Sequence, residues 1–369
     1  MSVIKPIPWL IFIFILDTGG WLNARLPVLL IFLLLIIVKN RININSRPIN
    51  AWVLLLATII PSLIVGSNSG VDILSALPYI YPILIFPLLY IIFNSLRLNE
   101  FDLISAGLLF SMLIVALFLG SLAGISTVLS LIDFLASEPS AGFFKEKATF
   151  LNVPVQGIYF KATLLLTPIG LLAYSRKQWG AFFLILCALV IAQSKTGIVL
   201  LIIFCSFLNF KRMNLAKYLT LTVVVLGTTV LIFSIEALYE DIALGLVTRS
   251  LHFVSIYEAF SDSWSTLFSG FGAGSTFYSY GFLEYTDDSE ISQLEVLRRY
   301  GIVFFLTICY FYFYGIFRLL RNNNKPLAMA LLLYFVVSAS NPVLLATPAI
   351  IFYAIVSSLI FRKTQIEKV

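Results

Sequence analysis

Apolar stretches alternate with short polar stretches along the whole chain, and many of the apolar stretches approach the length of a membrane span. A helix needs about 20 apolar residues to cross the ~30 Å hydrocarbon core of a bilayer. The pattern predicts an all-α fold, a polytopic transmembrane helical bundle of about 12 spans (roughly 10–12). The expected spans are residues 7–22, 26–38, 50–66, 73–93, 103–123, 154–173, 179–193, 197–210, 218–235, 301–317, 327–345 and 347–361.

Two polar segments are longer than an ordinary connection between helices, and they are residues 124–153 and 236–299. Loops of more than about 15 residues in a compact protein usually carry function or are disordered. The second segment contains the only histidine of the chain and is rich in aromatic residues and glycine. We therefore expect it to be ordered. No internal repeat or soluble module is evident, which predicts one integral membrane domain over residues 1–369.

The composition agrees with a membrane protein. Of 369 residues, 60% are hydrophobic and only 11% are charged, whereas soluble domains are about 45–50% apolar and about 25% charged. The net charge of +6 is compatible with nucleic-acid binding, but the basic residues stand in short clusters between apolar stretches, as topology determinants do. The expected partner is a lipid bilayer, and no nucleic acid is expected.

The distribution of charge predicts the sidedness of the spans. Most of the 24 Lys and Arg residues fall on one side of the membrane, in the short connections that come after every second span. That side is cytoplasmic by the positive-inside rule. Among the acids, only Glu100, Asp102 and Glu367 are expected there. The pattern favours an even number of spans with both termini in the cytoplasm. It places the segments 124–153 and 236–299 on the outer face.

Residues 179–210 form an apolar stretch that is interrupted by Ser194-Lys195-Thr196-Gly197. One straight helix of that length exceeds the ~30 Å core, so we expect two short spans that meet at this turn, below the outer surface. A lysine there is costly unless it faces water or an anion. Lys195, Ser194 and Thr196 are therefore candidates for binding a lipid-linked diphosphate. The alternative is a lysine that snorkels to the surface and caps a helix.

The large outer segment carries further candidate residues. Arg249 and His252 are three positions apart, so on a helix they share a face. The glycines of Gly270-Phe271-Gly272-Ala273-Gly274 permit backbone conformations that are closed to other residues. Tyr278 and Tyr280 offer ring faces to sugars, although such rings also form interfacial aromatic belts.

Three cations stand where positive charge is unfavourable. Arg298 and Arg299 lie at the outer end of a predicted span. Their partner is either the local acids, such as Asp287 and Asp288, or a phosphate, which arginine binds with two parallel hydrogen bonds. Lys161 lies inside the predicted span 154–173, and an ionisable residue in a span indicates a functional site. We expect it to bind an anion or contact the substrate.

These features resemble the O-antigen polymerase and ligase superfamily in several places. The Ser194-Lys195 turn resembles the family's Ser-Arg or Ser-Lys turn between two spans. Arg249, Trp264 and the glycine-rich run 270–274 resemble the series in its large periplasmic loop. The resemblance covers roughly residues 154–361, and its remaining elements are Glu290 through Leu294 to Gly301, which resembles the end of that loop, and Asn341-Pro342, which is similar to the family's late segment.

The resemblance implies metal-independent glycosyl transfer on the periplasmic face of the bacterial inner membrane. The donor would be a growing glycan on undecaprenyl diphosphate, and the acceptor would be one repeat unit on the same carrier. Ligases of the family often carry histidine followed by asparagine where Glu290 and Ile291 stand here, and this departure favours a polymerase. A chain-length regulator protein is a further candidate partner. The alternatives are a ligase and a lipid-linked oligosaccharide flippase or transporter.

The departing diphosphate gains negative charge, so fixed cations should stabilise the transition state more than the ground state. Lys195, Arg249, Arg298 and Lys161 are the candidates, in that order, and Arg299 is a further substrate-binding candidate. The expected proton acceptor is Glu290, with His252 and Asp288 after it. The chain has no Asp-x-Asp pair and no His/Cys cluster, so no metal and no cofactor are expected.

Overall fold

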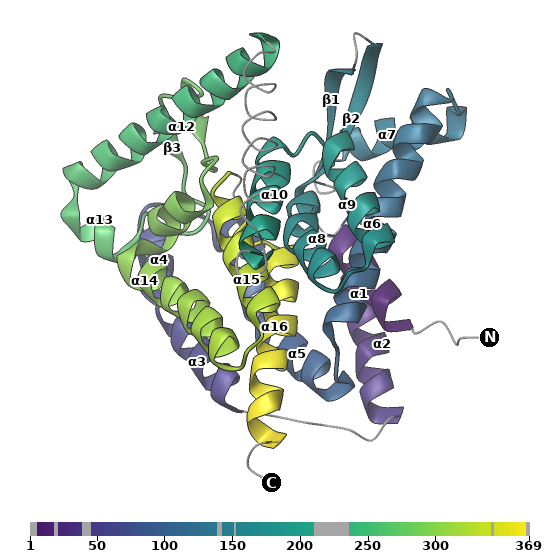
Figure 1. The fold of residues 1–369 in the computed structure, drawn as a ribbon. Coiled ribbons are helices and arrows are strands. Elements are labelled where there is room, and N and C mark those ends of the chain that lie inside the picture. The colour runs from purple at the N-terminus through teal and green to yellow at the C-terminus, as the bar shows by residue number, and fades with distance from the viewer. Residues whose placement is uncertain are drawn as a thin grey trace.

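The computed structural model describes residues 6–17, 21–38, 46–138, 142–150, 153–209, 236–340 and 343–366. The predicted span 218–235 and the Asn341-Pro342 pair lie outside these residues. The described chain is mostly helical and includes two small antiparallel sheets, each of two strands (Figure 1). The bundle is therefore helical as expected, but the all-α prediction is wrong for these two hairpins.

The element bounds are as follows. The helices are α1 (Pro6–Leu16), α2 (Arg25–Val38), α3 (Ser46–Ala57), α4 (Ile60–Asn68), α5 (Ile73–Leu96), α6 (Glu100–Leu122), α7 (Ser126–Ser137), α8 (Leu166–Ser175), α9 (Trp179–Ile191), α10 (Lys195–Asn209), α12 (Glu236–Asp262), α13 (Trp264–Ser269), α14 (Ser292–Arg321), α15 (Lys325–Val337) and α16 (Thr347–Ile366). The 3-10 turns are η2 (Lys161–Leu165) and η4 (Ser338–Ser340), and the strands are β1 (Phe143–Phe150), β2 (Val153–Phe160), β3 (Phe277–Ser279) and β4 (Glu284–Thr286).

Four helical segments among the described residues are long and apolar enough to cross a membrane. They are Ser46–Asn68, Leu74–Leu96, Glu100–Leu122 and Ser292–Arg321. Several shorter apolar helices accompany them, including Trp179–Ile191 and Lys195–Leu208. The expected break of residues 179–210 into two short helices is confirmed, because α9 ends at Ile191 and α10 begins at Lys195. The predicted turn is placed too late, since Lys195, Thr196 and Gly197 already belong to the first turn of α10.

The predicted span 154–173 is wrong in its first half. Val153–Phe160 is strand β2, which pairs with β1 in an antiparallel hairpin, and helix α8 begins only at Leu166. A short apolar run does not by itself distinguish a strand from a buried helix, and here the neighbouring strand satisfies the backbone. Lys161 therefore lies at the end of a hairpin, where it is exposed, and not within a helix.

Prolines inside α5 shape how its neighbours pack. Pro87 has no amide hydrogen, so the carbonyl of Ile83, four residues earlier, loses its donor within the helix. The indole nitrogen of Trp52 on α3 donates to this carbonyl at 2.7 Å, and the Trp52 ring stacks on Phe86 at 3.9 Å. The carbonyl that Pro87 leaves without a donor in α5 thereby accepts a hydrogen bond that joins α3 to α5.

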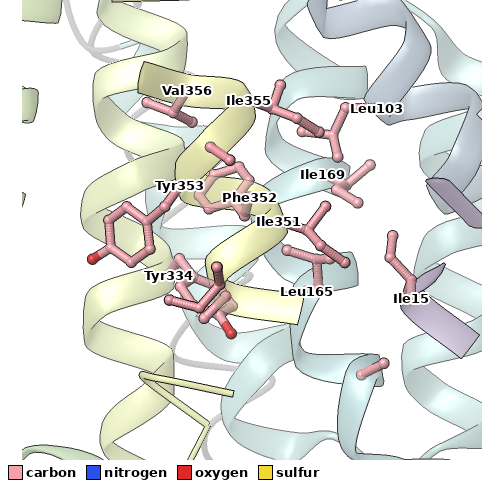
Figure 2. Packing of buried hydrophobic residues seen from close by; sticks show 14 of the residues in the cluster. Ile15, Leu103, Leu165, Ile169, Tyr334, Ile351, Phe352, Tyr353, Ile355 and Val356 are labelled. Carbon is pink, nitrogen blue, oxygen red and sulfur yellow. The ribbon is translucent and has the colours of Figure 1, made fainter. Parts of the chain in front are cut away.

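Helix α16 passes through the centre of the bundle. Its Ile351, Phe352 and Ile355 are almost completely buried. In Figure 2 the side chain of Ile351 lies beside those of Leu165 and Ile169. A helix that is apolar on all sides is stable only inside a large protein or a membrane, which accounts for this central position.

The described elements define two opposite ends of the bundle. Helix α12 and the β1–β2 hairpin lie together at one end, and the C-terminus lies at the other (Figure 1). Away from the first end, Glu100 at the start of α6 accepts hydrogen bonds from Arg176 and from Asn324, the latter at 2.9 Å. All three of these residues are expected on the cytoplasmic side from the charge pattern, and the fold brings them together.

Helix α14 is kinked at Gly301, whose φ of 80° lies in the left-handed region. A Cβ atom there would collide with the carbonyl of Phe268, and one on Gly270 would collide with the carbonyl of Arg299. The backbone amide of Phe271 donates to the carbonyl of Arg298 at 2.8 Å. The glycine-rich run therefore packs directly on the kink, and both glycines are needed for this close approach.

Replacing Gly301 by alanine is expected to destabilise the protein by about 1–3 kcal/mol or more, because strain at positive φ adds to the collision. The measurement is the thermal midpoint in detergent or in proteoliposomes. Gly180→Ala is the matched control, since Gly180 lies in α9 with open space around it. Equal midpoints for the two variants would contradict this account of the kink.

Candidate functional site

A cavity of about 900 Å³ lies where the first turns of α2, α5 and α14 meet the end of the β1–β2 hairpin. We call it the polar cavity. Its lining residues are Arg25, Leu74, Leu77, Pro78, Tyr79, Tyr81, Pro82, Gly142, Lys161, Asp287, Asp288, Ser292, Glu295, Val296, Arg299, Tyr300, Leu344, Leu345, Ala346 and Thr347. Segments that are far apart in the sequence thus share one site, which combines charged, aromatic and aliphatic side chains.

Three cations line the polar cavity, and each comes from a different segment: Arg25, Lys161 and Arg299. The Nε atom of Arg25 donates to the carbonyl of Asp17 at 2.9 Å, and its guanidinium lies 5.4 Å from the ring centre of Tyr81. The backbone amide of Lys161 donates to the carbonyl of Gly142 at 2.8 Å, while its side chain is exposed. These contacts hold the side chain of Arg25 and the backbone of Lys161 at the wall of the cavity.

Arg299 is buried and has several protein partners. Its Nη2 atom donates to the carbonyl of Asp287 at 2.6 Å and lies 3.6 Å from Oδ1 of Asp288. Its Nε atom forms an ion pair with Glu295, and its guanidinium lies 3.7 Å from the ring centre of Tyr79. Arg299 therefore lines the cavity as a fixed positive charge that is already partly neutralised.

Arg298 points elsewhere and does not line the polar cavity. It is 1% exposed and forms an ion pair of 2.5 Å with Glu295. Its Nη1 atom donates to the carbonyl of Ser275 at 2.9 Å, and Nη2, which pairs with Glu295, also donates to the carbonyl of Asp287 at 2.8 Å. Of the two partners expected for Arg298, a local acid is the one present, and the acid is Glu295. The spacings i,i+3 and i,i+4 from Glu295 to the arginines are the sequence signal for this pairing.

The two neighbouring aspartates of the cavity have different electrostatics. Burial acts to raise the pKa of Asp287, but the hydrogen bond from Tyr79 and the charge of Arg299 outweigh it, so the pKa is lowered. Burial raises the pKa of Asp288 to about 6, with Glu295 acting in the same direction and Arg299 opposing it. Asp287 is thus ionised near neutral pH, whereas Asp288 titrates just below neutrality.

Arg249 and Glu290 lie close together but outside the lining of the polar cavity. The Nε atom of Arg249 on α12 is 3.3 Å from Oε2 of Glu290, and both side chains are about one-third exposed. The Nη2 atom of Arg249 also donates to the carbonyl of Ser340 at 3.4 Å. Glu290 follows Asp288 by two residues, so this ion pair flanks the segment that forms one wall of the cavity.

His252 lies on helix α12, is buried against the β3–β4 hairpin, and does not line the polar cavity. Its Nδ1 atom and Oγ of Ser279 are 2.8 Å apart, and its ring packs edge-on against Phe282 at 4.6 Å. Its Nε2 atom has no hydrogen-bond partner. Burial lowers the pKa of His252 more than the nearby Glu290 raises it. The arrangement supports a neutral ring that positions the loop, and it does not expose the ring to a substrate.

Acidification is expected to destabilise the folded protein through His252. Its pKa is lowered in the fold, so its contribution is complete above the unfolded value of ~6.5 and is lost as the pH falls below that value. The thermal midpoint should therefore drop between pH 7.5 and 5.5 by less in His252→Asn than in the unchanged protein. An identical drop in both proteins would mean that His252 does not contribute.

The turn between α9 and α10 has a compact geometry. Ser194 is buried, and its carbonyl accepts a hydrogen bond from the amide of Ile198 at 2.9 Å. A Cβ on Gly197 would lie 2.5 Å from Oγ of Ser194. Lys195 is partly buried and Thr196 is exposed. None of these residues lines the polar cavity, so the predicted diphosphate site at the turn and the cavity are separate places.

Tyr278 and Tyr280 lie on the surface of the same loop. Both rings are exposed, and their centres are 5.7 Å apart. The hydroxyl of Tyr280 donates to Glu258 on α12 at 2.7 Å. Neither ring lines the polar cavity. Three tyrosines do line it: Tyr79 and Tyr81 on α5, and Tyr300 on α14. Tyr79 and Tyr81 stand within an apolar run, which hides them from sequence reasoning.

Within the described residues, no group of three or more His, Cys, Asp or Glu side chains is arranged to hold a metal ion. No family model matches the chain, and no curated protein and no solved structure matches it. The chemistry of the polar cavity and the residues beside it is therefore what supports a function.

Proposed function

We propose that this protein is a polysaccharide polymerase, a glycosyltransferase that joins repeat units carried on undecaprenyl diphosphate. The reaction takes place on the periplasmic face of the bacterial inner membrane. It makes O-antigen or capsule chains and uses no metal. The observation that carries the proposal is the convergence of Arg25, Lys161 and Arg299 on one cavity at the expected outer end of the bundle.

The contents of the polar cavity suit a lipid-linked diphosphate. Its volume of about 900 Å³ is at the upper end of the ~300–1,000 Å³ usual for small-molecule sites. The cations attract the diphosphate, and the rings of Tyr79 and Tyr81 offer faces to sugars. Aliphatic residues such as Leu77 and Leu345 form the rest of the wall, which suits the first isoprene units of the carrier.

The chemistry requires a hydroxyl of the acceptor sugar to attack the anomeric carbon of the donor. The bond between that carbon and the diphosphate oxygen breaks, and negative charge accumulates on the leaving group. Fixed cations near that group stabilise the transition state more than the ground state. Lys161 has an exposed side chain at the cavity wall, whereas Arg299 is buried and already paired with Glu295.

The proposal includes about 12 spans, cytoplasmic termini and periplasmic segments 124–153 and 236–299. Its support is that residues expected outside meet in the polar cavity, while Glu100, Arg176 and Asn324, expected inside, meet elsewhere. Single cysteines at exposed positions test this sidedness. Tyr285→Cys should react with a membrane-impermeant maleimide in whole cells, and Lys177→Cys should react only after the membrane is opened. The reverse result would refute the topology.

The function is tested with a deletion strain. Its lipopolysaccharide or capsule should carry a single repeat unit, because assembly stops before polymerisation, and expression of the protein should restore long chains. Persistence of long chains attached to the cell surface would refute the polymerase. Long chains that remain on the lipid carrier would instead indicate a ligase, and repeat units found only on the cytoplasmic face would indicate a flippase.

A further inference from the structure

The acids that line the polar cavity differ in the hydrogen bonds and ion pairs that their carboxylate oxygens already form. Glu295 is buried and paired with both Arg298 and Arg299. Asp287 accepts the hydroxyl of Tyr79. The Oδ1 atom of Asp288 is buried 3.6 Å from Arg299 and accepts no hydrogen bond, while the side chain as a whole remains 38% exposed at the cavity wall. Among the described acids that line the cavity, Asp288 is the one that combines an exposed side chain with a carboxylate that no side-chain hydrogen bond engages.

The other expected proton acceptors are placed less well. Glu290 is held by Arg249 at 3.3 Å and does not line the cavity. His252 is fully buried beneath the β3 loop. Asp288, unlike these two residues, lines the cavity, and the arginine with which it pairs at 3.6 Å, Arg299, lines the same wall. A proton acceptor must come within hydrogen-bond reach of the group it deprotonates, and this favours Asp288.

We propose that Asp288 accepts the proton of the attacking sugar hydroxyl in the polar cavity. This inference deepens the glycosyl transfer proposed above and rests on it. The hydroxyl oxygen forms a bond to the anomeric carbon of the donor as its O–H bond breaks, and the proton passes to the Asp288 carboxylate. The anomeric carbon–oxygen bond to the diphosphate breaks, and the diphosphate leaves with that electron pair. Asp288 then releases the proton to solvent.

The groups around Asp288 determine the pH range in which its carboxylate is ionised and able to accept a proton. The titratable and charged groups around the cavity are Arg25, Tyr79, Tyr81, Lys161, Asp287, Glu295, Arg299 and Tyr300. Burial and Glu295 favour the protonated acid, whereas Arg299 and Lys161 favour the carboxylate. The balance puts the pKa of Asp288 at about 6. The reaction rate should therefore rise with pH through about 6 and level off above it.

The test uses the full-length protein in proteoliposomes with lipid-linked repeat units extracted from the deletion strain. Initial rates of chain elongation are measured from pH 5 to 8 at saturating substrate. Asp288→Asn should lower the maximal rate ~10²–10⁴-fold, as expected when a positioned proton acceptor is lost, and should abolish the rise near pH 6. Asp288→Glu should restore part of the rate. Asp287→Asn, the matched control, should keep the rise.

The outcomes separate this inference from the function on which it rests. If the unchanged protein does not elongate the extracted repeat units, the polymerase proposal fails. If it elongates them and Asp288→Asn keeps both the rate within a few-fold and the rise near pH 6, Asp288 is not the proton acceptor. If Glu290→Gln abolishes the rise and Asp288→Asn keeps it, Glu290 takes the role. Circular dichroism and thermal midpoints establish that each variant is folded.

Discussion

Lys161→Gln should reduce chain elongation ~10²–10³-fold, the usual consequence of removing one fixed group that stabilises transition-state charge. Lys161 lines the polar cavity, and its side chain is exposed rather than committed to the interior. The hydrogen bond to Gly142 uses the backbone amide and is unaffected by the substitution. The effect should therefore fall on activity and leave the thermal midpoint unchanged. Polymer length distributions and initial rates measure it.

The matched control is Lys177→Gln, which removes one exposed lysine between α8 and α9, away from the cavity. It should support wild-type polymer length. Lys161→Arg should retain much of the activity, because the positive charge is preserved. If Lys161→Gln elongated chains at the wild-type rate and at a normal protein level, the polar cavity would not be the site of the reaction. This conclusion would hold whatever the roles of Arg249 and Lys195.

Arg298→Met should destabilise the protein by about 3–5 kcal/mol, the usual cost of removing one partner from a buried ion pair. Arg298 is 1% exposed. Its loss leaves Glu295 with one arginine partner, Arg299, in place of two, and it leaves the carbonyl of Ser275 without this donor. The segment that precedes α14, including Asp288, should loosen as a result. Thermal midpoints and limited proteolysis of the loop measure the change.

Arg321→Gln is the control on the same helix, because Arg321 is exposed at the far end of α14. Surface substitutions of this kind usually change stability by less than about 0.5 kcal/mol. If Arg298→Met and Arg321→Gln had the same midpoint, the network around Glu295 would not be stabilising. If Arg298→Met were stable but inactive, Arg298 would have a role in binding rather than in structure.

Hydropathy was a good guide to helices and a poor guide to the segment around Lys161. Helix α5 begins at Ile73 and α9 at Trp179, as expected, because a long apolar stretch in lipid must satisfy its backbone within a helix. Residues 154–160 were misassigned to a helix because a strand and a short buried helix segment look alike in an apolar run. Pairing with β1, a contact that no local pattern encodes, decides between them.

The sequence by itself determined the class of this protein: a chain rich in helix-length apolar stretches, with its cations unevenly distributed between them. It also identified Lys161, Asp288 and Arg299 of the site, although not Arg25 or Glu295, because a charge at the end of an apolar stretch is costly without a partner. Only the tertiary structure decided which charges have partners within the protein. Arg298 forms a buried ion pair with Glu295, His252 is fully buried, and Lys161 lines the cavity. Burial and pairing depend on distances between remote segments, and these exist only once the helices have packed.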